Sequence, residues 1–330
     1  MEHEPETQRI LVTGGSGFIG TNAVQHWLDR GFQVLNYDIK PPQNPGHRGL
    51  WNRGDIRNLA ELKSAYESFR PHYLLHLAAR TDLDERDDLR GYATNIEGVR
   101  NIVEIAGRAR ELRRAIFASS RMVCRIGYQP RDDEDYAAPN LYGESKVQSE
   151  LIVRESGLPC EWLIVRPTSI WGPWFDVPYK QFFLAIRRWR YFNPGDHNAV
   201  KSFGFVGNTV LQIERLFEAP AETVNGRTLY LCDYPPLRVR QWAEMIRESW
   251  QAPRIINLPF PLLRCVALAG DLLDRAGVKR VPLTSFRLDN LVTDMTYDTG
   301  LLEKLCGPLR YDLKEGVQLT VEWLSNHHPA

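Results

Sequence analysis

The sequence has no long hydrophobic run and no excess of either charge. Lysine and arginine together number 41 of its 330 residues, and aspartate and glutamate also number 41. Nucleic-acid-binding proteins usually show a basic excess or stripe, so we expect no nucleic-acid partner. No stretch reaches the roughly 20 apolar residues that cross a membrane, so we expect no membrane span. The most apolar segment, 258–273, is interrupted by Pro259, Pro261, Arg264 and Asp271. It predicts a helix that is buried or covers a substrate, with contact to a membrane surface as the alternative.

Cysteine is also scarce. The five cysteines stand at positions 124, 160, 232, 265 and 306, an odd number without the close spacing of metal ligands. We therefore expect no metal site and free thiols in a reducing compartment, which predicts a cytoplasmic protein. The segment 1–8, MEHEPETQ, lacks the basic start and the apolar run of a signal peptide, and we expect it to form a disordered lead.

The first half of the chain does contain a regular alternation of strand and helix patterns. This alternation predicts βαβ units and therefore an α/β fold with a Rossmann-type, doubly wound parallel sheet. The predicted strands are 9–13, 33–37, 50–54, 73–77, 114–118 and 160–165, and the predicted helices are 18–30, 89–110 and 141–155.

The pattern changes after Pro167, where prolines and tryptophans become frequent and the alternation stops. One more strand is predicted at 226–233, and an amphipathic helix at 237–251. We therefore expect a Rossmann domain at 9–175. The remainder, 176–330, should be mainly a smaller, mixed α/β lobe that binds the substrate, with some segments returning to the first sheet.

A glycine-rich loop, TGGSGFIG, follows the first predicted strand. Gly14 permits a tight turn, Gly17 lets the backbone approach a pyrophosphate, and Gly20 lets the next helix pack closely on the sheet. The first-turn N–H groups of that helix, beginning at Phe18 and Ile19, then point at the phosphates. Because the glycines lie between a strand and a helix of the first βαβ unit, the loop predicts a dinucleotide cofactor.

Asp38 ends the second predicted strand, 18 residues after Gly20. A carboxylate there accepts hydrogen bonds from the adenosine ribose hydroxyls and repels a 2′-phosphate, which favours NAD over NADP. Lys40 lies close enough in the sequence to weaken that preference.

These residues belong to a larger set that resembles the extended short-chain dehydrogenases/reductases, the family of NAD-dependent nucleotide-sugar epimerases and dehydratases. The resemblance implies NAD as the cofactor and a homodimer that pairs helices 89–110 and 141–155 with their copies. Residues 313–323 also look like the closing helix of that family. The other markers occur in family order over the first 175 residues: TGGSGFIG at 13–20, Gly54-Asp55-Ile56, HLAAR at 76–80, Thr94-Asn95-Ile96-Glu97-Gly98, Ala118-Ser119-Ser120, Tyr142-x-x-x-Lys146, and Arg166-Pro167 with Gly172-Pro173.

A catalytic group is predicted at Ser120, Tyr142 and Lys146. Tyr142 and Lys146 are four residues apart on a predicted helix, so they share one face. The ammonium should lower the tyrosine pKa from about 10, so that Tyr142 can take a proton from a substrate hydroxyl while hydride leaves for the nicotinamide. The resemblance implies that Lys146 also holds the nicotinamide ribose and that Ser120 bonds the substrate oxygen.

Further cofactor contacts follow from the resemblance alone. It implies that Asp55 and Ile56 flank the adenine and that Asn95 supports the cofactor side of the cleft. Other residues are expected to line the cofactor at the end of the fourth strand or to lie beside the nicotinamide carboxamide: Leu77, Ala78, Ala79, Pro167 and Thr168.

The sequence departs from the family at positions that bear on the substrate. The 4,6-dehydratases place an Asp-Glu pair just after the catalytic Ser or Thr, whereas Arg121 and Met122 stand here. Neither residue acts as a carboxylate acid or base, which argues against 4,6-elimination. Epimerases often have Asn where Ser169 stands, and an acidic pair is replaced within 202–208, SFGFVGN.

We expect a nucleoside-diphosphate sugar as the substrate, with Thr81, Ser169, Lys201 and Arg287 as candidate contacts. The predicted activity is that of an NAD-dependent epimerase or oxidoreductase acting through a transient ketone. Two alternatives stay open: an NAD-dependent dehydrogenase of an apolar alcohol, of the 3β-hydroxysteroid type, and a non-catalytic NAD-binding regulator.

Overall fold

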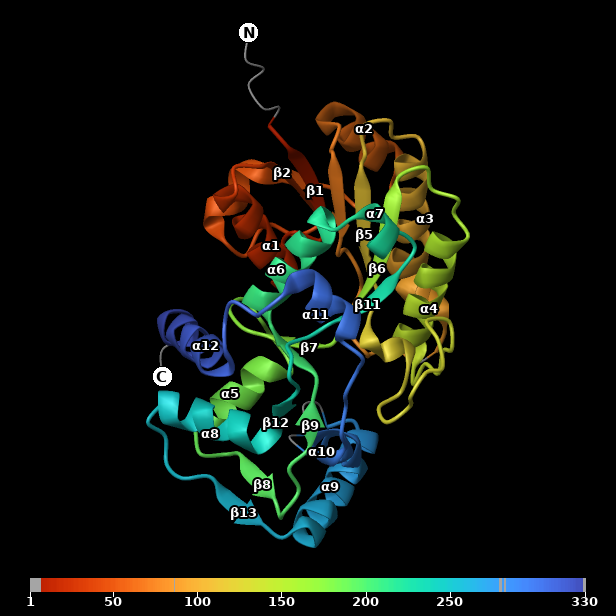
Figure 1. The fold of residues 1–330 in the computed structure, drawn as a ribbon. Coiled ribbons are helices and arrows are strands. Elements are labelled where there is room, and N and C mark those ends of the chain that lie inside the picture. Colours follow the sequence, from red (N-terminus) through yellow and green to blue (C-terminus); the bar gives the residue numbers. More distant parts are fainter. Residues whose placement is uncertain (1–6, 86, 279–280, 282, 329–330) are drawn as a thin grey trace.

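The computed structural model describes residues 7–85, 87–278, 281 and 283–328, so most of the expected disordered lead lies outside the described residues. Its centre is one parallel sheet of seven strands in the order β11-β6-β5-β4-β1-β2-β3 (Figure 1). This is the predicted doubly wound Rossmann-type fold, with its switch point between β1 and β4. The strands are β1 (Arg9–Thr13), β2 (Gln33–Asp38), β3 (Trp51–Arg53), β4 (Tyr73–His76), β5 (Arg114–Ala118), β6 (Glu161–Pro167) and β11 (Thr228–Leu231).

Strand β1 is apolar on both sides because helices cover both faces of the sheet. Ile10 and Val12 point into the core on one face, and Leu11 points into the core on the other. The strand therefore shows an uninterrupted apolar run and not the alternation of a half-exposed strand.

The two faces of the sheet have different covers (Figure 1). One face carries α1 (Phe18–Asp29) and α6 (Val206–Glu218). The other carries α2 (Leu59–Phe69), α3 (Ala93–Gly107) and α4 (Leu141–Arg154). The sequence analysis did not anticipate α2, and the helix expected at 89–110 is a 3-10 turn, η2 (Leu89–Tyr92), followed by α3.

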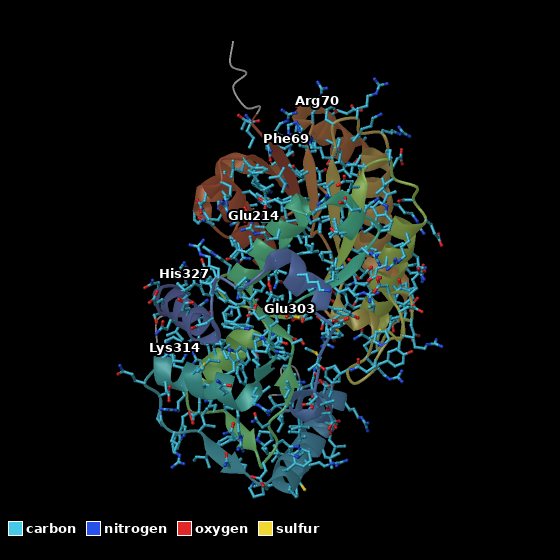
Figure 2. The ribbon with its side chains drawn as sticks, in the orientation of Figure 1. Phe69, Arg70, Glu214, Glu303, Lys314 and His327 are labelled. Carbon is cyan, nitrogen blue, oxygen red and sulfur yellow. The ribbon has the colours of Figure 1, made fainter. Side chains whose placement is uncertain are left out.

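A buried carboxylate joins α6 to α1, although the two helices lie far apart in the sequence. Glu214 accepts from Arg30 at 2.8 Å and lies 3.2 Å from His26, while its own side chain is 3% exposed. Figure 2 shows Glu214 at this junction. The contact places a segment of the second half of the chain on the sheet, where β11 also pairs with β6.

Most of the remaining elements form what we call the outer lobe, which lies below the sheet in Figure 1. Its strands are only two or three residues long, and its core is an aromatic cluster in which Trp242 stacks on Phe182 at 4.8 Å. The helix expected at 237–251 begins two residues later, after the short strand β12. The elements of the lobe are α5 (Tyr179–Arg187), β8 (Phe192–Pro194), β9 (Val200–Lys201), β12 (Leu237–Arg238), α8 (Val239–Ser249), β13 (Ile256–Leu258), α9 (Phe260–Arg275) and α10 (Ser285–Val292).

Four further elements connect the lobe to the sheet. They are β7 (Ser169–Trp171) with its partner β10 (Phe203–Phe205), α11 (Gly300–Cys306), and α12 (Leu313–His327). α12 starts with a reciprocal capping box between Asp312 and Glu315, which satisfies its first N–H groups.

Candidate active site

The glycine loop lies between β1 and α1 in close contact with the end of β4. Gly14 has a φ of +73°, and a Cβ there would lie 2.6 Å from the amide nitrogen of Ala78. A Cβ on Gly20 would lie 2.2 Å from the carbonyl oxygen of Gly14. Both positions therefore need glycine, the first for its conformation and both for close packing.

Helix α1 begins at Phe18 without a side-chain cap on Gly17. Its first-turn N–H groups therefore remain available to phosphate oxygens, next to a loop that has no side chain at Gly17. This arrangement fits the pyrophosphate of a dinucleotide.

Asp38 lies at the carboxyl end of β2 and faces the loop. Its carboxylate accepts from the backbone N–H of Ser16 at 3.0 Å and of Lys40 at 2.9 Å. Burial raises the pKa of this carboxyl, and the two backbone hydrogen bonds and the Lys40 ammonium act against that rise. The carboxylate is thus held against the glycine loop, and its contact with a ribose stays a prediction.

Asp55 and Ile56, expected beside the adenine, lie in the loop after β3. Ile56 is 3% exposed and packs against α3, where a Cβ on Gly98 would lie 2.3 Å from its Cδ1. Asp55 forms an ion pair with Arg57 at 2.6 Å, which lowers the pKa of Asp55.

The segment after β4 extends the edge of the sheet near the loop. Leu77 continues the strand pairing by donating its N–H to the carbonyl of Thr13, and Ala78 touches Gly14. On the far side of the sheet, Thr168 donates both its N–H and its hydroxyl to the carbonyl of Leu231, which ties the end of β6 to β11. Pro167 and Ala79 lie beside these residues and are half-buried.

Asn95 is completely buried and connects three segments. Its Oδ1 accepts from the N–H of Arg80 at 2.8 Å, and its Nδ2 donates to the Ser145 hydroxyl at 2.8 Å. Asn95 therefore holds the loop after β4 against α4, the helix of Tyr142 and Lys146. This bonding supports the shape of the site and is not itself a ligand contact.

The structure brings Ser120 and Tyr142 together at the carboxyl end of β5. Each is 8% exposed, and the Ser120 hydroxyl also accepts from the N–H of Met122 at 3.1 Å. A short 3-10 turn, η3 (Arg121–Val123), packs on the first turn of α4, where a Cβ on Gly143 would lie 2.2 Å from the Met122 carbonyl oxygen.

The prediction that the Lys146 ammonium lowers the pKa of Tyr142 is wrong in this structure. The pKa of Tyr142 is raised, mainly because burial disfavours the phenolate, and the groups that act against the rise are Ser120 and Arg121. Lys146 instead donates to the carbonyl of Ala118 at 2.9 Å. Burial lowers the pKa of Lys146 to about 8, and Glu150 acts in the opposite direction.

Arg121 is a site residue whose role the sequence analysis missed, because it was considered only for the carboxylate that it replaces. Its charge lowers the pKa of Tyr142, Tyr179 and Lys201, so its guanidinium lies close to all three. Its side chain forms no hydrogen bond or ion pair with the part of the chain that the structure describes. The signal in the sequence was its position directly after Ser120.

Ser169 lies on β7, is 5% exposed, and interacts with the hydroxyl of Tyr179 from α5. The structure therefore adds Tyr179 and Arg121 to the side of the site that faces the outer lobe. Tyr179 could not be recognised beforehand, because only the packing of α5 brings it to β7.

Of the other three candidate substrate residues, Lys201 lies near Arg121 but is held by other contacts. Lys201 is 2% exposed and donates to the carbonyls of Asn290, at 2.7 Å, and Thr293, so its ammonium holds the end of α10. Arg287 is exposed on α10 and donates to the carbonyl of Val281 at 2.6 Å. Thr81 is exposed after β4.

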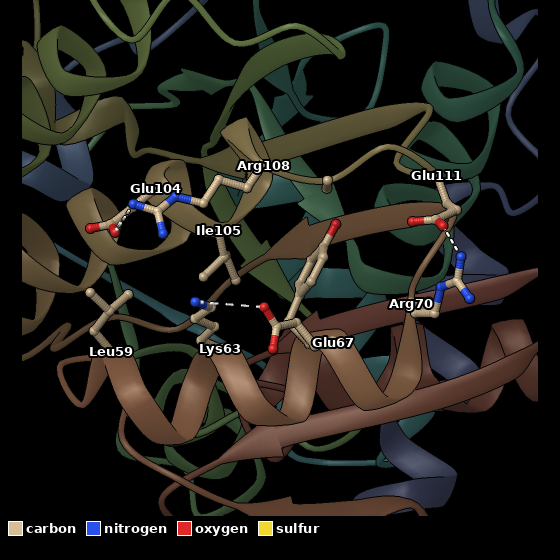
Figure 3. Close-up of a pocket in the computed structure, with 10 residues that line it drawn as sticks. Leu59, Lys63, Glu67, Arg70, Glu104, Ile105, Arg108 and Glu111 are labelled. Atoms are coloured by element: carbon tan, nitrogen blue, oxygen red, sulfur yellow. Dashed lines mark hydrogen bonds and ion pairs between the residues drawn. The ribbon is translucent and has the colours of Figure 1, made fainter.

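A separate cavity of about 150 Å³ lies between α2 and α3 (Figure 3). Ion pairs stand at its rim, Lys63 with Glu67 at 3.7 Å and Arg108 with Glu104 at 2.9 Å. It shares no residue with the glycine loop or with the Ser120–Tyr142–Lys146 group, so it is not the site described above.

Comparisons with known proteins agree with this geometry. Residues 10–232 match the model of the NAD dependent epimerase/dehydratase family. A 3-beta-hydroxysteroid dehydrogenase from Mycolicibacterium neoaurum is 28% identical over 267 residues, covering 72% of this chain and 69% of the relative. An N-acetyl-alpha-D-glucosaminyl-diphospho-ditrans,octacis-undecaprenol 4-epimerase from Escherichia coli O157:H7 is 25% identical over 321 residues, covering 95% and 94%. The crystal structure of a UDP-glucose 4-epimerase from Thermotoga maritima with UDP-glucose superposes with a TM-score of 0.74 at 19% identity, covering 97% and 99%.

Proposed function

The chain belongs to the NAD dependent epimerase/dehydratase family, and from that premise we propose that it oxidises a hydroxyl of a nucleoside-diphosphate sugar to a transient ketone and then reduces the ketone. Reduction from the other face of the same carbon makes the enzyme an epimerase. The observation that carries this proposal is the buried group of Ser120, Tyr142 and Lys146. It lies at the same edge of the parallel sheet as the glycine loop, where ligands of such sheets bind.

Tyr142 is the proposed acid and base. Its phenolate takes the proton of the substrate hydroxyl during oxidation, and the phenol so formed returns that proton during reduction. Ser120 holds the substrate oxygen, and Arg121 stabilises the phenolate that burial disfavours. NAD, when bound, supplies the hydride acceptor and afterwards the hydride donor. Lys146 donates to the Ala118 carbonyl, and we assign to the same ammonium the nicotinamide ribose hydroxyls.

Two observations support an anionic sugar substrate. The first is that Arg121 stands beside Tyr142 and its side chain has no ion-pair partner among the described residues. A buried or half-buried cation without a partner is costly, and an anionic ligand removes that cost. One of the relatives that match the chain over nearly its whole length is a 4-epimerase named for an N-acetylglucosaminyl-diphospho substrate.

A second candidate is a dehydrogenase of an apolar alcohol. It is supported by the 3-beta-hydroxysteroid dehydrogenase relative, which is 28% identical. The two candidates differ in cofactor balance, because an epimerase returns its hydride in every cycle and a dehydrogenase releases reduced cofactor.

The test is incubation of the purified protein with a panel of UDP- and dTDP-sugars and a catalytic amount of NAD. We expect conversion to an epimer by anion-exchange chromatography and NMR, with no net rise of absorbance from reduced nicotinamide. Reduced nicotinamide formed in proportion to a 3β-hydroxysteroid, with no conversion of any sugar nucleotide, would replace the first candidate by the second.

The same incubation tests whether the protein catalyses 4,6-elimination, for which dehydratases use an Asp-Glu pair in place of Arg121 and Met122. Elimination of water needs a base at a carbon and an acid at the leaving hydroxyl, and Arg121 and Met122 supply neither. We expect no 4-keto-6-deoxy sugar by mass spectrometry. A product lighter by one water would mean that carboxylates from elsewhere in the chain do this work.

We also propose a homodimer in which α3 and α4 pair with their copies in a four-helix contact. The two helices pack side by side on the same face of the sheet, and an isologous contact is the commonest geometry for a dimer. Light scattering should show twice the chain mass at micromolar concentration, and a monomer at that concentration would contradict the proposal.

A further inference from the structure

Exposed apolar side chains are concentrated in one part of the outer lobe. Fourteen large hydrophobic side chains are exposed in the described residues, and eight of them lie between residues 256 and 286. Single exposed hydrophobic residues are ordinary, whereas a contiguous group marks an interaction surface. Figure 1 shows α9 and α10, which carry most of the group, at the end of the molecule opposite the N-terminus.

The group forms one face of α9. Its members are 50 to 66% exposed and fall within an arc of about 160° around the helix, namely Leu262, Val266, Leu268, Leu272 and Leu273. We call this set the apolar face. Exposed Cys265 lies within the same arc, and Phe286 of α10, which is 60% exposed, adds to the surface.

The opposite side of α9 packs against the rest of the outer lobe. Leu263 and Ala267 are buried against Leu288 of α10, and a Cβ on Gly270 would lie 1.9 Å from the carbonyl oxygen of Leu283. The helix is therefore held in place by one side, and the apolar face contributes nothing to the core of the described chain.

Basic residues stand along one edge of the apolar face. Arg264 and Arg275 are both exposed and lie about 20° apart around the helix, next to Leu268. The side chain of Arg264 has no hydrogen bond or ion pair with any described residue. An arginine at the edge of an apolar helical face can extend its guanidinium toward lipid phosphates while its stem and the leucines enter the acyl region.

We propose that the apolar face of α9 docks the protein on an anionic phospholipid bilayer, with the helix lying in the plane of the interface. No described helix is long and apolar enough to cross a membrane, so the contact is peripheral. The charge pattern favours this occupant, because a wide apolar strip edged by two arginines matches acyl chains beneath anionic headgroups. This inference does not rest on the proposed reaction.

Packing contacts within the outer lobe link the apolar face to the neighbourhood of the active site. α9 packs on α10, and the Lys201 ammonium holds the end of α10 through the carbonyls of Asn290 and Thr293. A bilayer on α9 would therefore lie on the lobe that adjoins Arg121 and Tyr179.

The first test is co-sedimentation of the full chain with vesicles of phosphatidylcholine, with and without phosphatidylglycerol. We expect binding that is stronger with phosphatidylglycerol and weaker at high salt. The double variant Leu268→Glu/Leu272→Glu should lower the affinity at least about 10-fold. Leu319→Glu, which places the same charge at an exposed apolar position on α12, should leave the affinity unchanged.

A second set of variants tests the contribution of the Arg264 charge to vesicle binding. Arg264→Gln should lower the affinity for phosphatidylglycerol vesicles about 5-fold and have little effect on phosphatidylcholine vesicles. Arg48→Gln, at an exposed arginine in η1 (Pro45–Leu50), is the matched control. Thermal unfolding and NAD titration of each variant establish that the fold is intact.

The exposed thiol of Cys265 gives a readout of insertion. Three of the other four cysteines are buried, so Cys306→Ser leaves Cys265 as the reactive thiol. An environment-sensitive fluorophore on Cys265 should shift to the blue with anionic vesicles and be quenched by brominated acyl chains.

Two results would overturn the proposal. One is the absence of binding to anionic vesicles, or binding that the Leu268→Glu/Leu272→Glu change leaves intact. The other is a protein that is dimeric by light scattering and becomes monomeric with that change, which would make the apolar face a contact between copies of the chain.

Discussion

The sheet half of the molecule, residues 9–171, and the outer lobe differ in how the fold brings their polar residues into position. In the sheet half, consecutive strands end at one edge, and short motifs directly after them supply Gly14, Asp38 and Ser120. In the outer lobe, Lys201 bonds to Asn290 and Thr293, which lie 89 and 92 residues further on.

This difference shows why one region can be interpreted from the sequence and the other cannot. The carboxyl ends of parallel strands necessarily meet, so a motif that follows a strand has a known place. No such rule applies to strands of two or three residues. In the outer lobe, the packing of the aromatic cluster determines how the elements are arranged. We expect substitutions in the sheet half to affect cofactor and chemistry, and substitutions toward the lobe to affect the substrate side.

The largest expected effect is on the pair that connects α4 to β6. Glu150 and Arg166 are each 1% exposed and make two bonds, at 2.7 and 2.8 Å. Glu150→Ala leaves the buried guanidinium without its carboxylate, although it keeps its bonds to Tyr230 and to the carbonyl of Asp133, and should lower the free energy of unfolding by about 3–5 kcal/mol. Urea denaturation measures the loss. Glu155→Ala, at the exposed end of the same helix, should change stability by less than about 0.5 kcal/mol, and equal losses in both variants would contradict the role of the pair.

Tyr142→Phe should separate chemistry from cofactor binding within the sheet half. It removes only the phenolic oxygen, so turnover should fall by at least about 10²-fold while the Kd for NAD is retained. Steady-state kinetics and calorimetry measure the two quantities. Tyr128→Phe, whose hydroxyl bonds to Asp135 away from Ser120, is the control. Turnover within a factor of about three of wild type would defeat the assignment of Tyr142.

The third prediction concerns the pH dependence of stability and the buried carboxyl of Asp233, at the junction of the two regions. Its carboxylate accepts from the N–H of Phe205 and from Asn208, and burial raises its pKa from 3.8 to about 7. Because the folded state then binds this proton more tightly than the unfolded state does, stability should fall as pH rises from about 4 to about 7, by on the order of 2 kcal/mol.

Urea denaturation at pH 5 and pH 8 measures this loss. Asp233→Asn should flatten the difference between the two pH values, and Asp289→Asn, at an exposed position on α10, should not. An unaltered pH dependence in Asp233→Asn would show that other groups cause it.

The smallest expected effect concerns the choice of cofactor. Asp38→Ala removes the carboxylate that repels a 2′-phosphate, and the preference for NAD over NADP should fall by about 10-fold, or about 1.4 kcal/mol. Fluorescence titration with both cofactors measures the ratio. Asp29→Ala, an exposed carboxylate at the end of α1, should not alter it. If the unmodified protein binds NADP more tightly than NAD, our interpretation of Asp38 is wrong.

The sequence by itself determined the sheet and its cofactor edge. The six strands predicted over the first half all occur, with ends that differ by a few residues, because a strand covered on both faces reads as an uninterrupted apolar run. The glycine loop could be located because only glycine tolerates the turn at Gly14 and its contact with Ala78. Helix α2 was not anticipated, although it is as amphipathic as the helices that were.

Tertiary structure alone decided the chemistry around these motifs. The spacing of Tyr142 and Lys146 was consistent with an ammonium that lowers the tyrosine pKa, but the fold directs that ammonium to the Ala118 carbonyl and brings Arg121 to the phenol instead. It also commits Lys201 to the end of α10. Charge interactions depend on distances of a few ångströms and on burial, and both are set by how distant segments pack. Spacing along the chain therefore located the catalytic group, and packing decided which charge acts on it.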